Sequence, residues 1–294
     1  MTVVLLCPGQ GQVPRDLAGE VRASGDDLCA AYEERFRPAG LEDPLGDYAR
    51  QQAALVAVGV GRARRALALL GEPAPAAEYG PVVAVAGHSL GELTALFVSG
   101  AVDGPTAVRL AAARGAAFEA ARTPAWDDAG MLAVSGPAVQ NEIVPLIERH
   151  AVDLANDNAP DQVVVVGRTA SLTAMAAEAR ELGLRAVRLE TTGPSHSPYA
   201  APAVAPYIAT LRSVDLAPPA IPQWMGLTAA PVTDAPREIG AIIGARVRWR
   251  EVLLGLGGLE PSYFLDIGPG GAMARLARKT VPTVATLTLD ELAP

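Results

Sequence analysis

Positions 82–98 read as a strand, a tight corner and a helix in immediate succession. An apolar run, Val82–Ala86, leads into the sequence GHSLG at positions 87–91, and Glu92–Val98 has a helical pattern. A serine in such a corner has its hydroxyl held out of the sheet, and the flanking glycines let strand and helix approach closely. The amide of Leu90 lies at the start of the helix, where a developing oxyanion is stabilised. We therefore predict that Ser89 is a nucleophile, with a purely structural turn as the alternative.

Composition narrows the class of protein. The chain has 294 residues, 50% of them hydrophobic, and a formal net charge of -8. The length suits one large or two ordinary domains, and the negative charge argues against nucleic-acid binding, which needs a clustered basic face. Cys7 and Cys29 lack metal-ligand spacing, so we expect buried, reduced thiols and no metal site. Neither a signal-peptide pattern nor an apolar run of membrane-spanning length is present, which predicts a soluble, cytoplasmic protein without membrane contact.

The middle of the chain differs from its flanks and is expected to form a separate unit. Between residues 126 and 191 the pattern predicts strand, helix, strand, strand, helix, strand, which is the ferredoxin-like order. The predicted elements are strands at 131–134, 152–155, 162–167 and 186–189 and helices at 138–150 and 172–182, with a polar turn at Asn156–Pro160. The predicted fold class is therefore α/β. A large α/β-hydrolase-like domain, formed by residues 1–125 and 192–294, would carry a small ferredoxin-like subdomain at 126–191.

A serine hydroxyl needs a base within hydrogen-bond reach, and the chain has three histidines. His88 is adjacent to Ser89, so its side chain should project away and pack under the corner. His150 closes a predicted surface helix. By elimination we predict that His196, in a loop where the two units meet, is the base; a solvated loop histidine is the alternative. No histidine follows His196, which argues against a simple esterase and leaves the group that orients the imidazole open. A backbone carbonyl serves that role as well as a carboxylate does.

Arg114 stands in an otherwise apolar helical stretch, Arg109–Gly115. An arginine in this setting is either an ordinary solvated residue or a bidentate clamp for a carboxylate. Its spacing alone favours neither interpretation.

Seven motifs in order resemble the malonyl-CoA:acyl-carrier-protein transacylase family, which includes the acyltransferases of fatty-acid and polyketide synthesis. They are PGQG at 8–11, GHSLGE at 87–92, RG at 114–115, ANDNAPDQV at 155–163, PSH at 194–196, VRW at 247–249 and DIGPG at 266–270. One such match is weak, but this many in order cover nearly the whole chain. The resemblance implies ping-pong acyl transfer, in which an acyl-CoA thioester acylates Ser89.

The resemblance also implies roles for individual residues. His196 would take the serine proton and later that of the phosphopantetheine thiol of an acyl carrier protein. The backbone amides of Gln10 and Leu90 would form the oxyanion hole, and Arg114 would clamp the free carboxylate of a malonyl-type group. The family orients its histidine through a backbone carbonyl, which here would lie in Ile242–Arg246. No bound cofactor is implied, because the CoA thioester and phosphopantetheine are substrates.

Departures from the family pattern bear on acyl specificity. Phe118 stands where methionine is common, and its larger ring would narrow or reshape the acyl pocket. Ser195 goes with methylmalonyl in polyketide acyltransferases but also occurs in malonyl transacylases, so malonyl, methylmalonyl and bulkier groups stay open. Asn156 and Asn158 would lie near the thioester arm or simply shape a turn. Gly226 replaces a common asparagine.

Other functions stay open on the sequence. An acyl-thioester hydrolase of the same fold would differ only in letting water reach the acyl-serine, and a related enzyme would move bulkier groups between carrier proteins. A non-catalytic docking subunit is the third alternative, although intact Ser89 and His196 argue against it. An acidic carrier protein would need a local basic patch on this acidic chain. Two clusters are candidates, although each alone reads more readily as a solvated helix face: Arg62, Arg64 and Arg65, and Arg275, Arg278 and Lys279.

Overall fold

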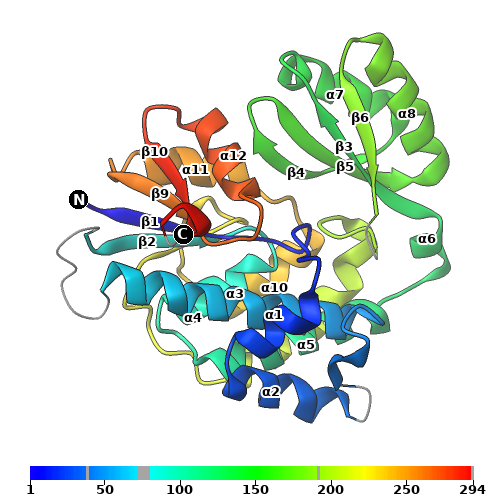
Figure 1. Cartoon of the computed structure of the whole chain (residues 1–294). Coiled ribbons are helices and arrows are strands. Elements are labelled where there is room, and N and C mark those ends of the chain that lie inside the picture. Colours follow the sequence, from blue (N-terminus) through cyan, green and yellow to red (C-terminus); the bar gives the residue numbers. More distant parts are fainter. Residues whose placement is uncertain (38–39, 72–79, 191–192, 293–294) are drawn as a thin grey trace.

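Two sheets organise the chain (Figure 1), for which the computed structural model describes residues 1–37, 40–71, 80–190 and 193–292. The larger sheet has the order β10-β9-β1-β2-β7-β8, and every pair in it is parallel except β7 with β8. Its strands are β1 (Val3–Cys7), β2 (Val82–Gly87), β7 (Gln223–Met225), β8 (Ala230–Pro231), β9 (Tyr263–Asp266) and β10 (Ala285–Thr288). The predicted α/β class is confirmed.

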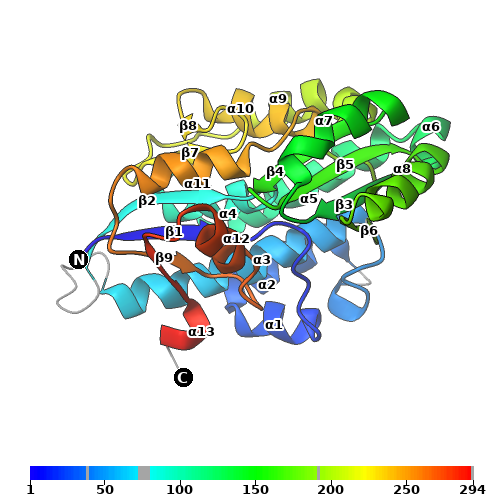
Figure 2. The same cartoon turned by 90° about the horizontal axis from the view of Figure 1, so that it is seen from above.

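Helices cover both faces of this sheet, as Figures 1 and 2 show. All five residues of β1 are buried, as expected of a central parallel strand. Val4 and Leu6 pack in one cluster with α11 and α12, whereas Val3 and Leu5 pack in another with α3 and α4. The α-helices are α1 (Leu17–Ala23), α2 (Asp26–Phe36), α3 (Tyr48–Leu70), α4 (Gly91–Val98), α5 (Gly104–Ala120), α6 (Pro124–Asp127), α9 (Val204–Arg212), α10 (Ala235–Ala241), α11 (Trp249–Gly257), α12 (Ala272–Thr280) and α13 (Leu289–Leu292). Short 3₁₀ turns lie at Gly40–Glu42, Pro198–Ala203 and Ile242–Gly244.

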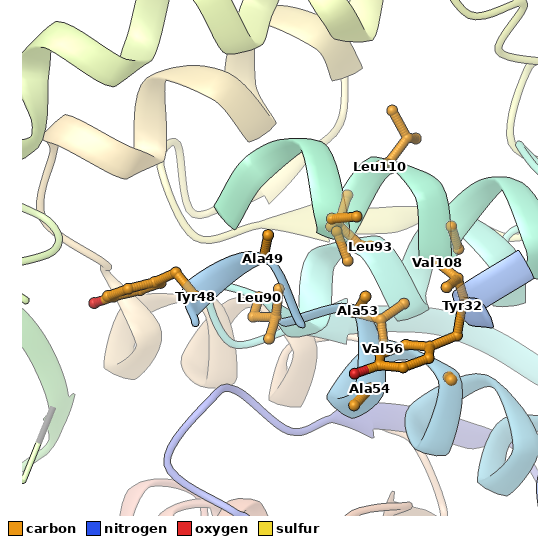
Figure 3. Close-up of a cluster of buried hydrophobic side chains, with 14 of the residues drawn as sticks. Tyr32, Tyr48, Ala49, Ala53, Ala54, Val56, Leu90, Leu93, Val108 and Leu110 are labelled. Atoms are coloured by element: carbon orange, nitrogen blue, oxygen red, sulfur yellow. The ribbon is translucent and has the colours of Figure 1, made fainter. Parts of the chain in front are cut away.

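The third and largest hydrophobic cluster joins α3, α4 and α5, and Figure 3 shows part of it. Each of the two long helices in it has an aspartate cap. Asp47 accepts a hydrogen bond from the amide of Arg50 at the start of α3, and Asp103 accepts one from the amide of Thr106 at the start of α5. Such caps satisfy amides that the helix itself leaves unpaired. The caps fix where α3 and α5 begin, and both helices carry residues of the site described below.

The smaller sheet is antiparallel throughout and has the order β4-β5-β3-β6. Its elements are β3 (Ala129–Ser135), α7 (Val139–His150), β4 (Asp153–Ala159), β5 (Gln162–Arg168), α8 (Thr169–Glu181) and β6 (Arg185–Leu189). This is the element order that the sequence predicts. The sheet lies beyond the end toward which β1 and β2 run (Figures 1 and 2). It therefore covers the carboxyl edge of the parallel sheet, where ligands bind in open α/β folds.

The predicted polar turn at Asn156–Pro160 is wrong. Strand β4 continues through Ala159, and the turn is confined to residues 160 and 161. The backbone explains the difference: the amide of Asp157 donates to the carbonyl of Val247 at 2.9 Å, and the amide of Val247 donates to the carbonyl of Ala155 at 2.9 Å. A remote segment thus holds extended a sequence whose local preference is for turns.

No helix in the described part of the chain has the length and apolar character that crossing a membrane requires.

Candidate active site

The predicted corner is present between β2 and α4. Ser89 has a φ of 54°, in the left-handed region that non-glycine residues disfavour. The glycines at 87 and 91 leave no room for a side chain. A Cβ on Gly91 would lie 2.5 Å from the carbonyl oxygen of Cys7, and one on Gly87 would lie 2.1 Å from the backbone of Gly91. Tight packing between strand and helix therefore maintains an unfavourable conformation at Ser89, as is typical of an exposed nucleophile.

His196 meets Ser89 across 107 residues of sequence. Its Nε2 lies 2.7 Å from the Ser89 Oγ, and its ring is buried, with 5% of the residue exposed. The backbone of His196 is also in the left-handed region, at φ 62°, and its amide donates to the carbonyl of Ile243 at 2.8 Å. The short turn at Ile242–Gly244 therefore holds the loop that presents the imidazole.

A backbone carbonyl sets the tautomer of His196. Its Nδ1 lies 2.7 Å from the carbonyl oxygen of Ile242. Because a carbonyl only accepts, Nδ1 must carry the proton, and Nε2 presents its lone pair to the Ser89 hydroxyl. Burial, followed by the nearby Arg114 guanidinium, lowers the pKa of His196 to about 3, so the ring is neutral at physiological pH. The carbonyl lies in the region 242–246 that the resemblance implied.

Arg114 is buried beside the nucleophile, with 2% of the residue exposed. Its Nη2 donates to the Ser89 Oγ at 3.1 Å, and its Nη1 donates to the Gln52 Oε1 at 3.0 Å. The guanidinium carbon lies 5.1 Å from the centre of the Phe118 ring. Burial lowers the pKa of Arg114. Its hydrogen-bond partners are neutral groups, and no carboxylate forms an ion pair with it among the residues that the structure describes.

Two glutamines of α3 link this arginine to the opening loop, and sequence reasoning missed both. Gln52 is fully buried and donates through Nε2 to the Gln10 Oε1 at 3.3 Å. Gln10 in turn donates to the Gln51 Oε1 at 2.6 Å. The sequence does contain an indication of this role, because two adjacent glutamines stand in a largely apolar helical run. An amide on the buried face of a helix needs hydrogen-bond partners.

These groups surround a cleft of about 300 Å³ between the two sheets. The predicted residues that line it are Gln10, Ser89, Asn156, Asn158, Ser195 and His196. Three others do not line it. Leu90 is buried in the cluster of α3, α4 and α5, and Phe118 is fully buried against Arg114, which reaches the cleft only through its contact with the Ser89 Oγ.

Comparison with known proteins agrees with this geometry. Residues 44–293 match the model of the acyl transferase domain family. The malonyl CoA-acyl carrier protein transacylase of Synechocystis sp. is 30% identical over 71% of this chain and 70% of its own length, and that of Mycolicibacterium smegmatis is 33% identical over 71% and 74%. The chain belongs to the malonyl-CoA:acyl-carrier-protein transacylase family. It is therefore an acyltransferase. A solved acyl-carrier-protein-S-malonyltransferase from Bartonella henselae superposes with a TM-score of 0.84 at 26% identity, covering 99% of this chain and 97% of that one.

His88 does more in this acyltransferase than pack under the corner. Its Nε2 lies 2.9 Å from the Asn158 Oδ1, and its ring meets the edge of Trp249 at 5.2 Å. Burial lowers its pKa. His88 and Asn158, with Gly11, line both the cleft and an adjoining cavity of about 460 Å³. The pair therefore forms a boundary between two spaces.

Glu92 is a third residue that sequence reasoning did not single out, although it closes the nucleophile motif. It is fully buried, and its Oε1 accepts a hydrogen bond from the amide of Gly226 at 2.8 Å. Its Oε2 has no partner in the described part of the chain. Burial raises the pKa of Glu92 to about 8. A buried, protonated acid thus braces the segment where Gly226 departs from the family pattern.

Proposed function

We propose that this acyltransferase moves a malonyl-type acyl group from CoA to the phosphopantetheine thiol of an acyl carrier protein. The observation that carries the acyl class is Arg114. A cation buried 3.1 Å from the nucleophile, with only neutral hydrogen-bond partners in the described chain, is costly unless a ligand supplies the counter-charge. A free carboxylate on the acyl group meets that need. The names of the relatives, malonyl transacylases, point to the same group.

In the first half-reaction the Ser89 Oγ attacks the thioester carbonyl of the acyl-CoA. His196 Nε2 accepts the hydroxyl proton as the new ester bond forms. The carbonyl oxygen becomes an oxyanion, for which we assign the backbone amides of Gln10 and Leu90 as donors. As the carbon–sulfur bond breaks, the imidazolium returns the proton to the departing CoA sulfur. The products are the Ser89 ester and free CoA.

In the second half-reaction the same groups work in reverse order. The carrier's phosphopantetheine thiol gives its proton to His196 Nε2, and its sulfur attacks the ester carbonyl. The oxyanion forms at the same donors, and the bond to the Ser89 Oγ breaks. The serine oxygen then recovers the proton from the imidazolium. The Ile242 carbonyl supports both steps, because it accepts from Nδ1 throughout and so stabilises the transient positive ring.

The basic cluster Arg275, Arg278 and Lys279 is our candidate for carrier docking. All three residues line the cavity of about 460 Å³ that adjoins the cleft at His88 and Asn158. A phosphopantetheine arm that enters there would keep its phosphate near the cations and bring its thiol toward Ser89. Ion pairing does not separate the two clusters, because Arg278 pairs with Glu291 and Lys279 with Asp161, just as Arg64 pairs with Asp27 and Arg62 with Asp290. The choice rests on the cavity that the first cluster lines.

We further propose the finer fold description, an α/β-hydrolase-like domain at 1–125 and 192–294 with a ferredoxin-like subdomain at 126–191. The antiparallel order β4-β5-β3-β6 and the order of the elements support it. The cytoplasmic location stays a prediction.

Intact-mass measurement in acid tests the function. The purified protein is incubated with malonyl-CoA, with and without a holo acyl carrier protein, beside a Ser89→Ala variant. We expect a malonyl adduct on the wild type only, which the carrier removes while gaining the malonyl group itself. An adduct that water removes equally fast without carrier would identify a hydrolase. A wild type that gains no adduct would favour a non-catalytic subunit.

A further inference from the structure

A third pocket, open to solvent, adjoins one wall of the cleft. It has a volume of about 240 Å³ and is lined by Gly46, Asp47, Tyr48, Phe118, Glu119, Arg122 and Trp126. Tyr48 is the residue that lines both this cavity and the cleft that holds Ser89. Tyr48 is therefore shared by the space for the acyl group and a neighbouring space of similar size.

Several contacts hold Tyr48 in this position. Its ring stacks on Phe118, with centroids 5.3 Å apart and planes 19° from parallel, and Phe118 meets Trp126 edge-on at 5.9 Å. The amide of Tyr48 donates to the Glu119 Oε1 at 2.8 Å. In Figure 3 the ring points away from the apolar side chains of α3. Stacked aromatic pairs add to the free energy of burial, so these contacts favour the observed position of the ring.

Glycine at position 115 brings the two supporting helices together. A Cβ on Gly115 would lie 2.4 Å from the Cα of Ala49, so α5 packs directly on the first turn of α3. This close approach sets Tyr48 of α3 on Phe118 of α5. The Phe118 ring also packs against the Arg114 guanidinium, and the ring centre lies 5.1 Å from the guanidinium carbon. One aromatic pair thus serves both the arginine and the wall.

We infer that Tyr48 sets the upper size limit of the acyl group, and that the cavity behind it would receive the side chain of a 2-substituted malonyl group if the ring were removed. The inference rests on the proposed function. In a malonyl ester on Ser89 the terminal carboxylate is held by Arg114, so a substituent on the central carbon must point elsewhere. Tyr48 closes one such direction, and Tyr48 is 6% exposed. The limit therefore comes from a single side chain with empty volume behind it.

The test compares acylation of Ser89 by malonyl-CoA and butylmalonyl-CoA in the wild type, Tyr48→Ala and Tyr48→Phe. One extra methylene in an apolar pocket changes selectivity by roughly 10- to 200-fold. We therefore expect Tyr48→Ala to raise the ratio of butylmalonyl to malonyl acylation at least about 10-fold. Tyr48→Phe keeps the ring and should keep the wild-type ratio. An unchanged ratio in a Tyr48→Ala protein that still takes malonyl would overturn the inference.

Two further measurements keep the outcome decisive. If Tyr48→Ala does not fold, Tyr48→Leu removes the ring with a smaller loss of buried volume and must shift the ratio in the same direction. A parallel series with acetyl-CoA and hexanoyl-CoA tests the size limit without a carboxylate. A wild type that takes no malonyl contradicts the proposed function alone, whereas an unchanged hexanoyl-to-acetyl ratio in the ring-deleted variant contradicts the size limit alone.

Discussion

The two walls of the cleft are built in opposite ways. On the wall from the parallel sheet, the Ser89 hydroxyl, the His196 ring and the Arg114 guanidinium are joined by hydrogen bonds that end at the Ile242 carbonyl. On the wall from the small sheet, the Asn156 side chain is buried, and its Nδ2 has no partner in the described chain. Hydrogen bonds on the first wall hold the reacting atoms in place, whereas the Asn156 amide nitrogen on the second wall has no such fixed partner. Chemistry should therefore be sensitive to the first wall and substrate affinity to the second.

The largest expected effect comes from breaking the bonded wall at His196. His196→Ala removes the base and leaves the Ser89 proton without an acceptor, so the rate of Ser89 acylation should fall roughly 10²- to 10⁴-fold. Reactions quenched with acid at successive times and analysed by intact mass give this rate from the fraction of acylated protein. Ser195→Ala, next in the chain and not bonded to the nucleophile, is the matched control and should change the rate far less. Equal losses in the two variants would contradict the role of the imidazole.

The pH dependence of the wild type sharpens the same point. His196 has a pKa of about 3 in the folded chain, below its ordinary 6.5. The neutral base is therefore present throughout the range from pH 8 to pH 5, and the acylation rate should stay nearly constant there. A rate that falls tenfold per pH unit below 6.5 would mean that the ring titrates normally. The folded protein should also lose stability as the pH falls from 6.5 toward 3, because the unfolded chain then binds the proton that the folded chain excludes.

Arg114→Ala is expected to have the next largest effect. Hydrogen bonds to charged groups contribute about 1.5–3 kcal/mol, which is roughly 10- to 100-fold in rate. The ratio of malonyl to acetyl acylation should fall by that factor in the variant, because the lost contact with the Ser89 Oγ affects both substrates whereas the lost clamp affects only malonyl. Arg114→Lys keeps the charge but not the planar pair of donors, and should recover only part of the preference. Equal turnover of malonyl-CoA by wild type and Arg114→Ala would refute the clamp.

How much of the site could be predicted from the sequence depends on whether each feature is local or formed by remote residues. The corner at Ser89 was predictable because strand, glycines and helix are all local. The pairing with His196 came from elimination among three histidines and the resemblance, and the orienting carbonyl was confined only to a region of five residues. Strand β4 was misread because Asn156, Asp157 and Asn158 favour turns locally. Its extended form depends on backbone hydrogen bonds with the remote segment at Val247, and no local pattern carries that information.

Glu92→Gln tests a buried group behind the bonded wall. Glu92 has an ordinary pKa of 4.5 in the unfolded chain and about 8 in the folded one. Between these values unfolding releases a proton, so wild-type stability should fall as the pH rises, with a slope of up to about 1.4 kcal/mol per pH unit. Glutamine cannot ionise, and it keeps an oxygen for the Gly226 amide. Urea unfolding at pH 6.5 and pH 8 should therefore show a smaller decline in the variant than in the wild type, and parallel declines would show that the Glu92 carboxyl ionises normally.

The smallest effect is expected where the small sheet is tied to the large one. Arg250 on α11 makes a bidentate ion pair with Asp157 on β4, with Nη2 2.8 Å from Oδ2, and the Asp157 side chain is 6% exposed while that of Arg250 is 32% exposed. Arg250→Ala leaves a buried carboxylate with only the weak contact from Gln140. We expect a loss of about 1–2 kcal/mol in the free energy of unfolding, discounted because Arg250 is partly solvated.

The nearby Arg248 provides the matched control for this last prediction. It pairs with Glu251 on its own helix and bonds the Thr228 carbonyl, so it does not bridge the two sheets. Arg248→Ala should cost less than about 1 kcal/mol, as exposed pairs do. If β4 forms the receiving wall, Arg250→Ala should also raise KM for acyl-CoA with little change in kcat, because the bonded wall is untouched. A fall in kcat at constant KM would show that the small-sheet wall affects the chemical step, and would contradict the proposed division of roles between the two walls.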